Sequence, residues 1–180
     1  MIDAMGELDG HLRALVAAAI EGDDVAVREF VRVTQPAVWR LCNVLGSPGE
    51  EEDLTQDTFM RALRSLASYR GESPVMGWLL SIARRVCADH VRARSRQRRL
   101  LVAVTNSASD GVVIDSDHAI WEIVRGIDPD RREAFVLTQV AGLSYDEAAV
   151  VLGCPVGTVR SRVARARADL ADAVRAAEAS

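Results

Sequence analysis

Residues 142–167 read GLSYDEAAVVLGCPVGTVRSRVARAR, and this stretch decides how the C-terminal part of the chain folds. Ser144 followed three residues later by Glu147 fits a capping box, which marks the start of a helix. Gly153 marks the end of that helix. Pro155 is expected to open a second helix, because the first amides of a helix have no internal partner to lose. The stretch therefore predicts two helices joined by a tight turn.

The second helix of this pair divides into two faces. Apolar residues recur at three- and four-residue steps and predict a buried stripe of Val156, Val159, Val163, Ala166 and Leu170. The outward face carries arginine forks that suit guanine edges and phosphates, and the first-turn amides can hold a backbone phosphate. This division predicts a DNA-binding helix-turn-helix. Its DNA-contacting residues are predicted to be Pro155, Thr158, Arg160, Ser161, Ala164 and Arg165.

An ordinary helical hairpin with a solvated arginine face is the alternative interpretation. It is unfavourable, because residues 160–167 hold four arginines without an interleaved acid, and like charges on one helix repel.

The charge of the whole chain is segregated. The 180 residues carry a net charge of −4, and every one of the 22 basic residues is an arginine. Residues 21–63 hold nine acids and four arginines, whereas residues 84–99 hold seven arginines and one acid. Because local patches set where a polyanion docks, the acidic total does not exclude nucleic acid as a partner. A length of 180 residues is enough for one domain or two small ones, and a hydrophobic content of 49% is enough for a core.

The cysteines and histidines predict no metal site and no cofactor. Cys42, Cys87 and Cys154 are far apart, no CxxC pair occurs, and the three histidines do not complete a ligand set. We interpret the cysteines as buried free thiols, with redox sensing as the minority alternative. No signal peptide and no membrane-spanning apolar run is evident, so we expect no membrane insertion and a cytoplasmic protein.

Helix signals recur along the chain and strand signals do not, which predicts an all-α fold. We expect N-caps where a capping residue precedes proline, at Ser47, Ser73 and Asp128. Helices are expected at about 8–19, 23–45, 48–66 and 74–99, and again from about 118.

A small, polar stretch at residues 105–111 is typical of a linker. The chain is therefore predicted to form two small helical domains, at 1–99 and 119–180, joined by a flexible linker at 100–118.

Two further helices carry a charged face. In DLTQDTF, residues 53–59, Asp53, Gln56 and Asp57 share one outward face with Met60. A solvated acidic face is the ordinary interpretation of that pattern, and early acids also complement the helix dipole. Further on, a mostly basic stripe extends about 20 Å along one helix, long enough to follow several phosphates. Its members are Arg85, Asp89, Arg92, Arg96 and Arg99.

The order of these motifs resembles a known family. An acidic DLTQDTF helix, then YRGESPVMGWLLSIARRVCADHVR, then the helix-turn-helix closely resembles the bacterial extracytoplasmic-function (ECF) sigma factors of actinobacterial type. The resemblance covers about residues 22–170. It implies an alternative sigma factor that binds RNA polymerase core and directs promoter-specific transcription initiation. Residues 1–99 would then be the sigma-2 domain and residues 119–180 the sigma-4 domain.

The resemblance also implies roles for individual residues. Asp53, Gln56 and Asp57 would dock on the beta-prime clamp of RNA polymerase core, whose beta flap would be a further contact. The helix-turn-helix would bind the minus-35 element. The loop from Tyr69 and the helix after it would open the minus-10 element and capture an unstacked base. The minus-10 set would be Tyr69, Arg70, Arg84, Arg85, Asp89, Arg92 and Arg96.

Three other expectations concern partners and activity. The family often works with an anti-sigma factor that wraps or wedges between the two domains. The alternative function is a stand-alone helix-turn-helix regulator, which would need a large self-complementary apolar surface to dimerise. An enzyme is not expected, because the consecutive acids at residues 50–53 point around their helix and do not converge on a metal ion.

Overall fold

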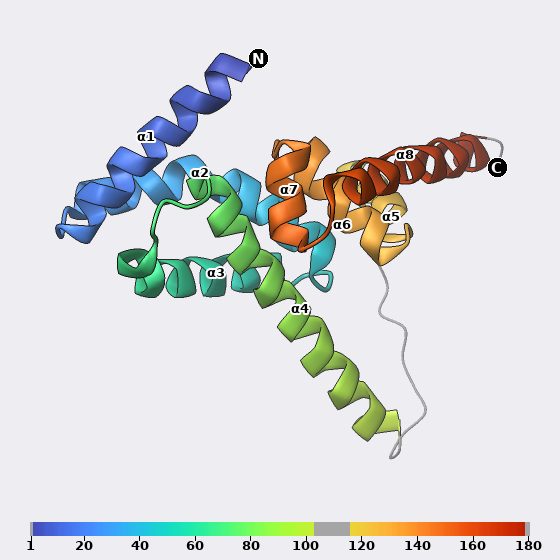
Figure 1. The fold of residues 1–180 in the computed structure, drawn as a ribbon. Coiled ribbons are helices and arrows are strands. Elements are labelled where there is room, and N and C mark those ends of the chain that lie inside the picture. The colour runs from blue at the N-terminus through green and yellow to red at the C-terminus, as the bar shows by residue number, and fades with distance from the viewer. Residues whose placement is uncertain (1, 103–115, 179–180) are drawn as a thin grey trace.

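The structure is a computed structural model that describes residues 2–102 and 116–178, and these two ranges contain helices and no strand (Figure 1). The all-α prediction is therefore confirmed. The first range forms α1 (Ile2–Ile20), α2 (Asp24–Leu45), α3 (Glu51–Ser65), the short 3-10 helix η1 (Leu66–Ser68) and α4 (Val75–Val102). The second range forms α5 (Ser116–Arg125), α6 (Pro129–Phe135), the π-helical turn η2 (Val136–Val140), α7 (Tyr145–Leu152) and α8 (Val156–Glu178).

Some of the predicted helix starts are confirmed. Asp128 caps α6 by accepting a hydrogen bond from the Arg131 amide, with Pro129 as the first helical residue. Asp23 caps α2 in the same way, through the amides of Val25 and Ala26. In each case the signal was local, because cap and amide lie within three residues of each other.

Two predicted caps are wrong. α3 begins at Glu51 and not at Pro48, because Ser47 instead starts a turn in which its carbonyl accepts the Glu50 amide at 3.2 Å. Three acids in the first turn of α3 complement the helix dipole in place of a side-chain cap. Ser73 is not a cap either, since the first amide of α4, that of Val75, bonds to Asp9 of α1.

The N-terminal half packs α2, α3 and α4 together, with α1 lying against α2 and α4 (Figure 1). Phe30 of α2 meets Phe59 of α3 edge to face, with ring centroids 6.5 Å apart. Thr34 and Thr58 are buried, and each hydroxyl donates to the carbonyl four residues earlier at 2.7 Å. Both buried hydroxyl groups are hydrogen-bonded, so burying them costs little free energy.

The two halves of the chain pack against each other. α2 contacts α5 and η2, and α4 contacts α7, so that buried side chains from both halves form one cluster. Among the described residues, two polar contacts join the halves. The Arg125 guanidinium donates to the backbone carbonyl and side-chain oxygen of Asn43 at 2.7 and 2.8 Å, and Arg84 pairs with Glu133 at 2.9 Å.

The predicted linker lies largely outside the described residues. Helix α4 reaches Val102 and α5 begins at Ser116, so helical residues enter both ends of the predicted 100–118 segment. The polar stretch at 105–111 lies outside the described ranges. The C-terminal part of α4 extends away from the other helices (Figure 1).

All three cysteines are free. Cys42 and Cys87 are buried, as predicted, while Cys154 is half-buried. Contact with Cys42, together with burial, raises the pKa of the Cys87 thiol above its ordinary value. A buried, protonated thiol behaves as a small apolar side chain.

Candidate nucleic-acid interface

The helix-turn-helix is formed by α7, a glycine turn and α8. Ser144 and Glu147 make both bonds of the predicted capping box, with the Ser144 amide donating to the Glu147 carboxylate at 2.7 Å. Gly153 adopts a left-handed conformation at φ +64°, and the Cys154 amide then reaches back to the Ala149 carbonyl at 3.1 Å. These bonds satisfy the free carbonyls at the end of α7 and fix where α8 starts.

Helix α8 is held to the domain by one face, as its sequence predicts. Val159, Val163 and Ala166 are buried, and Arg131 of α6 pairs with Asp169 at 2.8 Å. The opposite face is exposed to solvent and consists of Arg160, Ser161, Ala164 and Arg165. We call these four residues the α8 outer face.

The four arginines of α8 fall into two pairs. Arg162 is turned inward, where it bonds to Asp130 of α6, and Arg167 bonds to Gln139 of η2. Arg160 and Arg165 make no hydrogen bond or ion pair with any part of the chain that the structure describes. Two of the four guanidinium groups therefore brace the domain, and two remain available for a ligand.

The start of α8 differs from the prediction by one residue. Pro155 precedes the helix, and its carbonyl accepts the amides of Thr158 and Val159 at 2.9 and 3.2 Å. The Ser161 hydroxyl donates to the Thr158 carbonyl at 2.9 Å. Pro155 is exposed and Thr158 half-buried, so both stand at the N-terminal end of the α8 outer face.

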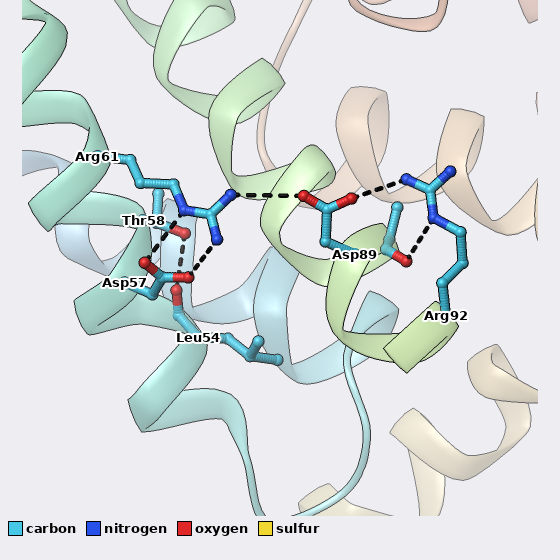
Figure 2. A network of polar contacts seen from close by, with 7 residues as sticks. Leu54, Asp57, Thr58, Arg61, Asp89 and Arg92 are labelled. Atoms are coloured by element: carbon cyan, nitrogen blue, oxygen red, sulfur yellow. Dashed lines mark hydrogen bonds and ion pairs between the residues drawn. The ribbon is translucent and has the colours of Figure 1, made fainter. Parts of the chain in front are cut away.

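The predicted acidic face of α3 is present, but one of its acids is already paired. Asp53, Gln56 and Met60 are exposed. Asp57 accepts two hydrogen bonds from Arg61, at 2.9 and 3.1 Å (Figure 2). This Arg61 was not among the predicted site residues, although its four-residue spacing from Asp57 is a signal that could have identified it.

Figure 2 shows that the network continues onto α4. Arg61 also reaches Asp89 at 3.4 Å, and Asp89 pairs with Arg92 at 2.9 Å. The acidic face of α3 and the basic stripe of α4 are therefore joined through one guanidinium group. Each of these pairs is substantially exposed, so each contributes little to stability.

The predicted basic surface of α4 is only partly free. Arg84 is paired with Glu133 of the other half, and Arg92 is paired with Asp89. The side chains that are exposed and make no bond within the described ranges are Arg70, Arg85 and Arg96. The side chain of Arg99 lies outside the described residues.

Tyr69 is held in place by its neighbours. Its hydroxyl donates to the Ser73 carbonyl at 2.5 Å, and its ring lies 5.2 Å from that of Trp78. Burial raises the pKa of the Tyr69 hydroxyl above its ordinary value, so it remains a donor at neutral pH. Tyr69 thus stabilises the loop at residues 69–74, of which it is the first residue.

Two negative observations apply to the described ranges. No three histidine, cysteine or acidic side chains come close enough together there to hold a metal ion. Within those ranges no helix is long and apolar enough to cross a membrane.

Comparison with protein-family models places the two halves in one family. Residues 30–97 match sigma-70 region 2, and residues 117–170 match sigma-70 region 4. The chain is 44% identical to the ECF RNA polymerase sigma factor SigC of Mycobacterium tuberculosis over 176 residues, 92% of each chain.

Two solved structures are also similar. CnrH, in complex with the cytosolic domain of CnrY, matches with a TM-score of 0.73 and 30% identity, over 92% of this chain and 98% of CnrH. The sigma factor RpoE of Bartonella quintana, in complex with the anti-sigma factor NepR, matches with a TM-score of 0.72 and 28% identity, over 82% of this chain and 96% of RpoE.

Proposed function

The chain belongs to the extracytoplasmic-function sigma factors of the sigma-70 family and is an alternative sigma factor that directs transcription. From this we propose which surface of the protein binds which partner. Residues 1–99 act as the sigma-2 domain and residues 119–180 as the sigma-4 domain, with the linker at 100–118. RNA polymerase core and promoter DNA are the partners. The names of the relatives support this assignment, because SigC is an RNA polymerase sigma factor.

The α8 outer face binds the minus-35 element. The observation that carries this assignment is the division of the four α8 arginines, in which Arg160 and Arg165 are exposed and unpaired within the described residues. Arginine forks on an exposed helix face suit bidentate bonds to guanine in the major groove. Pro155 and Thr158 lie at the end of the helix where its amides favour a phosphate.

The N-terminal half binds the polymerase and the minus-10 element. Asp53, Gln56 and Asp57 dock on the beta-prime clamp, and the sigma-4 half contacts the beta flap. The minus-10 element is opened and held by the loop at residues 69–74 and by the outward residues of α4. This set keeps all of its predicted members, which are Tyr69, Arg70, Arg84, Arg85, Asp89, Arg92 and Arg96. Arg84 and Arg92 must leave their present partners, Glu133 and Asp89, before they can bind phosphate.

Three further assignments complete the proposal. The chain has no catalytic centre of its own, since sigma factors are transcription initiation factors. It works in the cytoplasm, where RNA polymerase and promoter DNA are found. It also binds an anti-sigma factor, as RpoE of Bartonella quintana does.

Transcription from defined components tests the proposal. Purified core polymerase, the full chain and promoter fragments selected from the genome are expected to give run-off transcripts with defined starts, and core alone none. Binding to operator DNA without any association with core would instead support a stand-alone regulator and overturn the sigma assignment.

The surface assignments are tested with single variants in the same assay. Arg160→Ala is expected to weaken promoter binding by roughly 1–3 kcal/mol, the usual cost of losing one bidentate base contact. The effect should depend on the sequence of the minus-35 element. A loss that is equal across minus-35 variants would remove Arg160 from the base-contacting set.

A further inference from the structure

The loop between η1 and α4, residues 69–74, is tied to the N-terminal helix. Helix α1 lies far from this loop in the sequence, yet its Arg13 side chain bonds to the loop and its Asp9 side chain bonds to Val75, the first residue of α4. The Arg13 guanidinium donates to the Gly71 carbonyl at 3.2 Å and to the Ser73 carbonyl at 3.4 Å. One planar fork thus holds two carbonyls of a six-residue loop, which restricts the loop more than two separate donors would.

Asp9 connects Arg13 to the start of α4. One oxygen of its carboxylate accepts from Arg13 Nε at 2.6 Å, and the other accepts the Val75 amide at 2.8 Å. Val75 is fully buried, so the cap bonds to a fixed point of the fold. Asp9 therefore caps α4 from 66 residues away and aims Arg13 at the loop.

The close approach of Arg13 also explains a glycine in the loop. A Cβ atom at Gly71 would lie 2.9 Å from Arg13 Nη1, and the residue adopts φ +72°. The positive φ favours glycine at this position, and a Cβ there would also displace the end of the Arg13 side chain. The Tyr69 hydroxyl adds an internal bond to the Ser73 carbonyl, so the Ser73 oxygen is held from both sides.

We propose that Asp9 and Arg13 are positioning residues, which hold the loop at residues 69–74 in the conformation that receives an unstacked promoter base. This inference rests on the proposed minus-10 role of the loop. A flipped base loses its stacking, and the pocket must return that free energy. A loop that is already ordered pays less conformational entropy on binding than a mobile one, so α1 would increase the affinity for the base without touching DNA.

The test combines protein variants with promoter variants. Holoenzyme made from core polymerase and the full chain transcribes an intact promoter and matched promoters with an abasic site at each minus-10 position in turn. Removing the captured base removes the contribution of the loop. The wild type is expected to lose activity at one such position. Arg13→Ala should lower initiation about tenfold on the intact promoter, and change it little on that abasic promoter.

Two variants separate positioning from folding. Asp9→Asn keeps an oxygen for the Val75 amide but loses the charge that aims Arg13, so it should follow Arg13→Ala while retaining the cap. Arg32→Ala is the matched control, because Arg32 is an exposed arginine of α2 that is paired only locally, with Glu29. This variant should initiate transcription on the intact and the abasic promoter as well as the wild type does.

The outcomes are distinguishable. If Arg13→Ala lowers activity equally on intact and abasic promoters, its role is structural and the positioning proposal is overturned. If the wild type ignores abasic sites throughout the minus-10 element, base capture by the loop fails, and positioning fails with it. If neither template is affected by Arg13→Ala while the wild type is sensitive, only the positioning role is wrong.

Discussion

The two helices proposed to contact DNA, α4 and α8, differ in how many of their arginines are already paired within the protein. On α8 the outward guanidinium groups of Arg160 and Arg165 are free within the described residues, while those of Arg162 and Arg167 bond to other helices of the domain. On α4 the basic residues are partly neutralised, because Arg84 is paired across the halves and Arg92 of the outward stripe is paired with Asp89. Of the two helices proposed to contact DNA, α8 therefore has its outward arginines exposed as it stands, whereas Arg84 and Arg92 of α4 must exchange partners.

This difference fits the proposed roles of the two helices, in which α8 binds duplex DNA and α4 helps to open it. A helix that enters the major groove needs only to be packed firmly on its domain and to carry unpaired arginine side chains. A surface that holds melted DNA acts after polymerase has bound, so its arginines can be paired until then. The network of Figure 2, which joins the acidic face of α3 to Asp89 of α4, includes Asp57, one of the residues proposed to dock on polymerase.

The largest expected effect tests the α8 side of the comparison. The double variant Arg160→Ala, Arg165→Ala should weaken binding to a minus-35 duplex by roughly 2–6 kcal/mol, since each arginine is worth about 1–3 kcal/mol if it contacts a base. Fluorescence anisotropy of a labelled promoter duplex with the full chain measures this loss at fixed salt.

The matched control replaces the other two arginines of α8 with alanine. Arg162→Ala, Arg167→Ala removes the same charge from the same helix, but takes away side chains that bond to Asp130 and Gln139 of the domain, and should cost less than about 1 kcal/mol of DNA affinity. Equal losses in the two double variants would mean that α8 binds by net charge alone, and the division into outer and inner arginines would be wrong.

The next effect tests whether the two halves form one packed unit. The Arg125 side chain is 11% exposed and bonds to the buried Asn43. Arg125→Ala should lower the free energy of unfolding by about 1.5–3 kcal/mol, because charged hydrogen bonds are lost and an oxygen is left buried. Urea unfolding measures it.

Arg175→Ala, which breaks an exposed pair with Asp172, is the control and should cost less than about 1 kcal/mol. If Arg125→Ala also has no effect, the halves do not stabilise each other, and the partial neutralisation of α4 has no structural basis.

A smaller effect concerns the polymerase side of α3. Asp57→Ala should weaken binding to core polymerase by about 1 kcal/mol and leave minus-35 binding unchanged, because a partly exposed ion pair contributes little. Competition with the wild type for core measures this. Asp172→Ala is the matched control, an exposed acid paired with an arginine on another surface. Normal competition by the Asp57 variant would count against the clamp assignment.

Contacts between residues close in the sequence could be predicted, whereas contacts between residues distant in the sequence could not. The helix-turn-helix and its buried stripe follow from spacings of three and four residues, so Ser144, Gly153 and Val159 lie as predicted. The cap of α4 could not be predicted, because Asp9 is 66 residues from Val75. A local rule favoured Ser73, and a tertiary contact overrode it.

The site residues show the same limit. Exposure of Arg160 and Arg165 follows from helical periodicity. The pairing of Arg84 does not, since Glu133 belongs to the other half of the chain and nothing near Arg84 in the sequence points to it. Sequence therefore identifies which arginines can face DNA, whereas only the packed structure identifies which of them are already paired.

The smallest expected effect tests that pairing directly. Glu133→Gln should release Arg84 and strengthen binding of a single-stranded minus-10 oligonucleotide about two- to threefold, because a freed guanidinium adds one phosphate contact in a partly exposed place. Any variant that removes a negative charge also attracts DNA slightly. Glu29→Gln therefore serves as the control, since it removes one charge from a pair with Arg32 on α2. Only a gain beyond that of the control reports the release of Arg84. Equal gains would show that the pair with Glu133 does not restrain the arginine, and that α4 is as ready for DNA as α8.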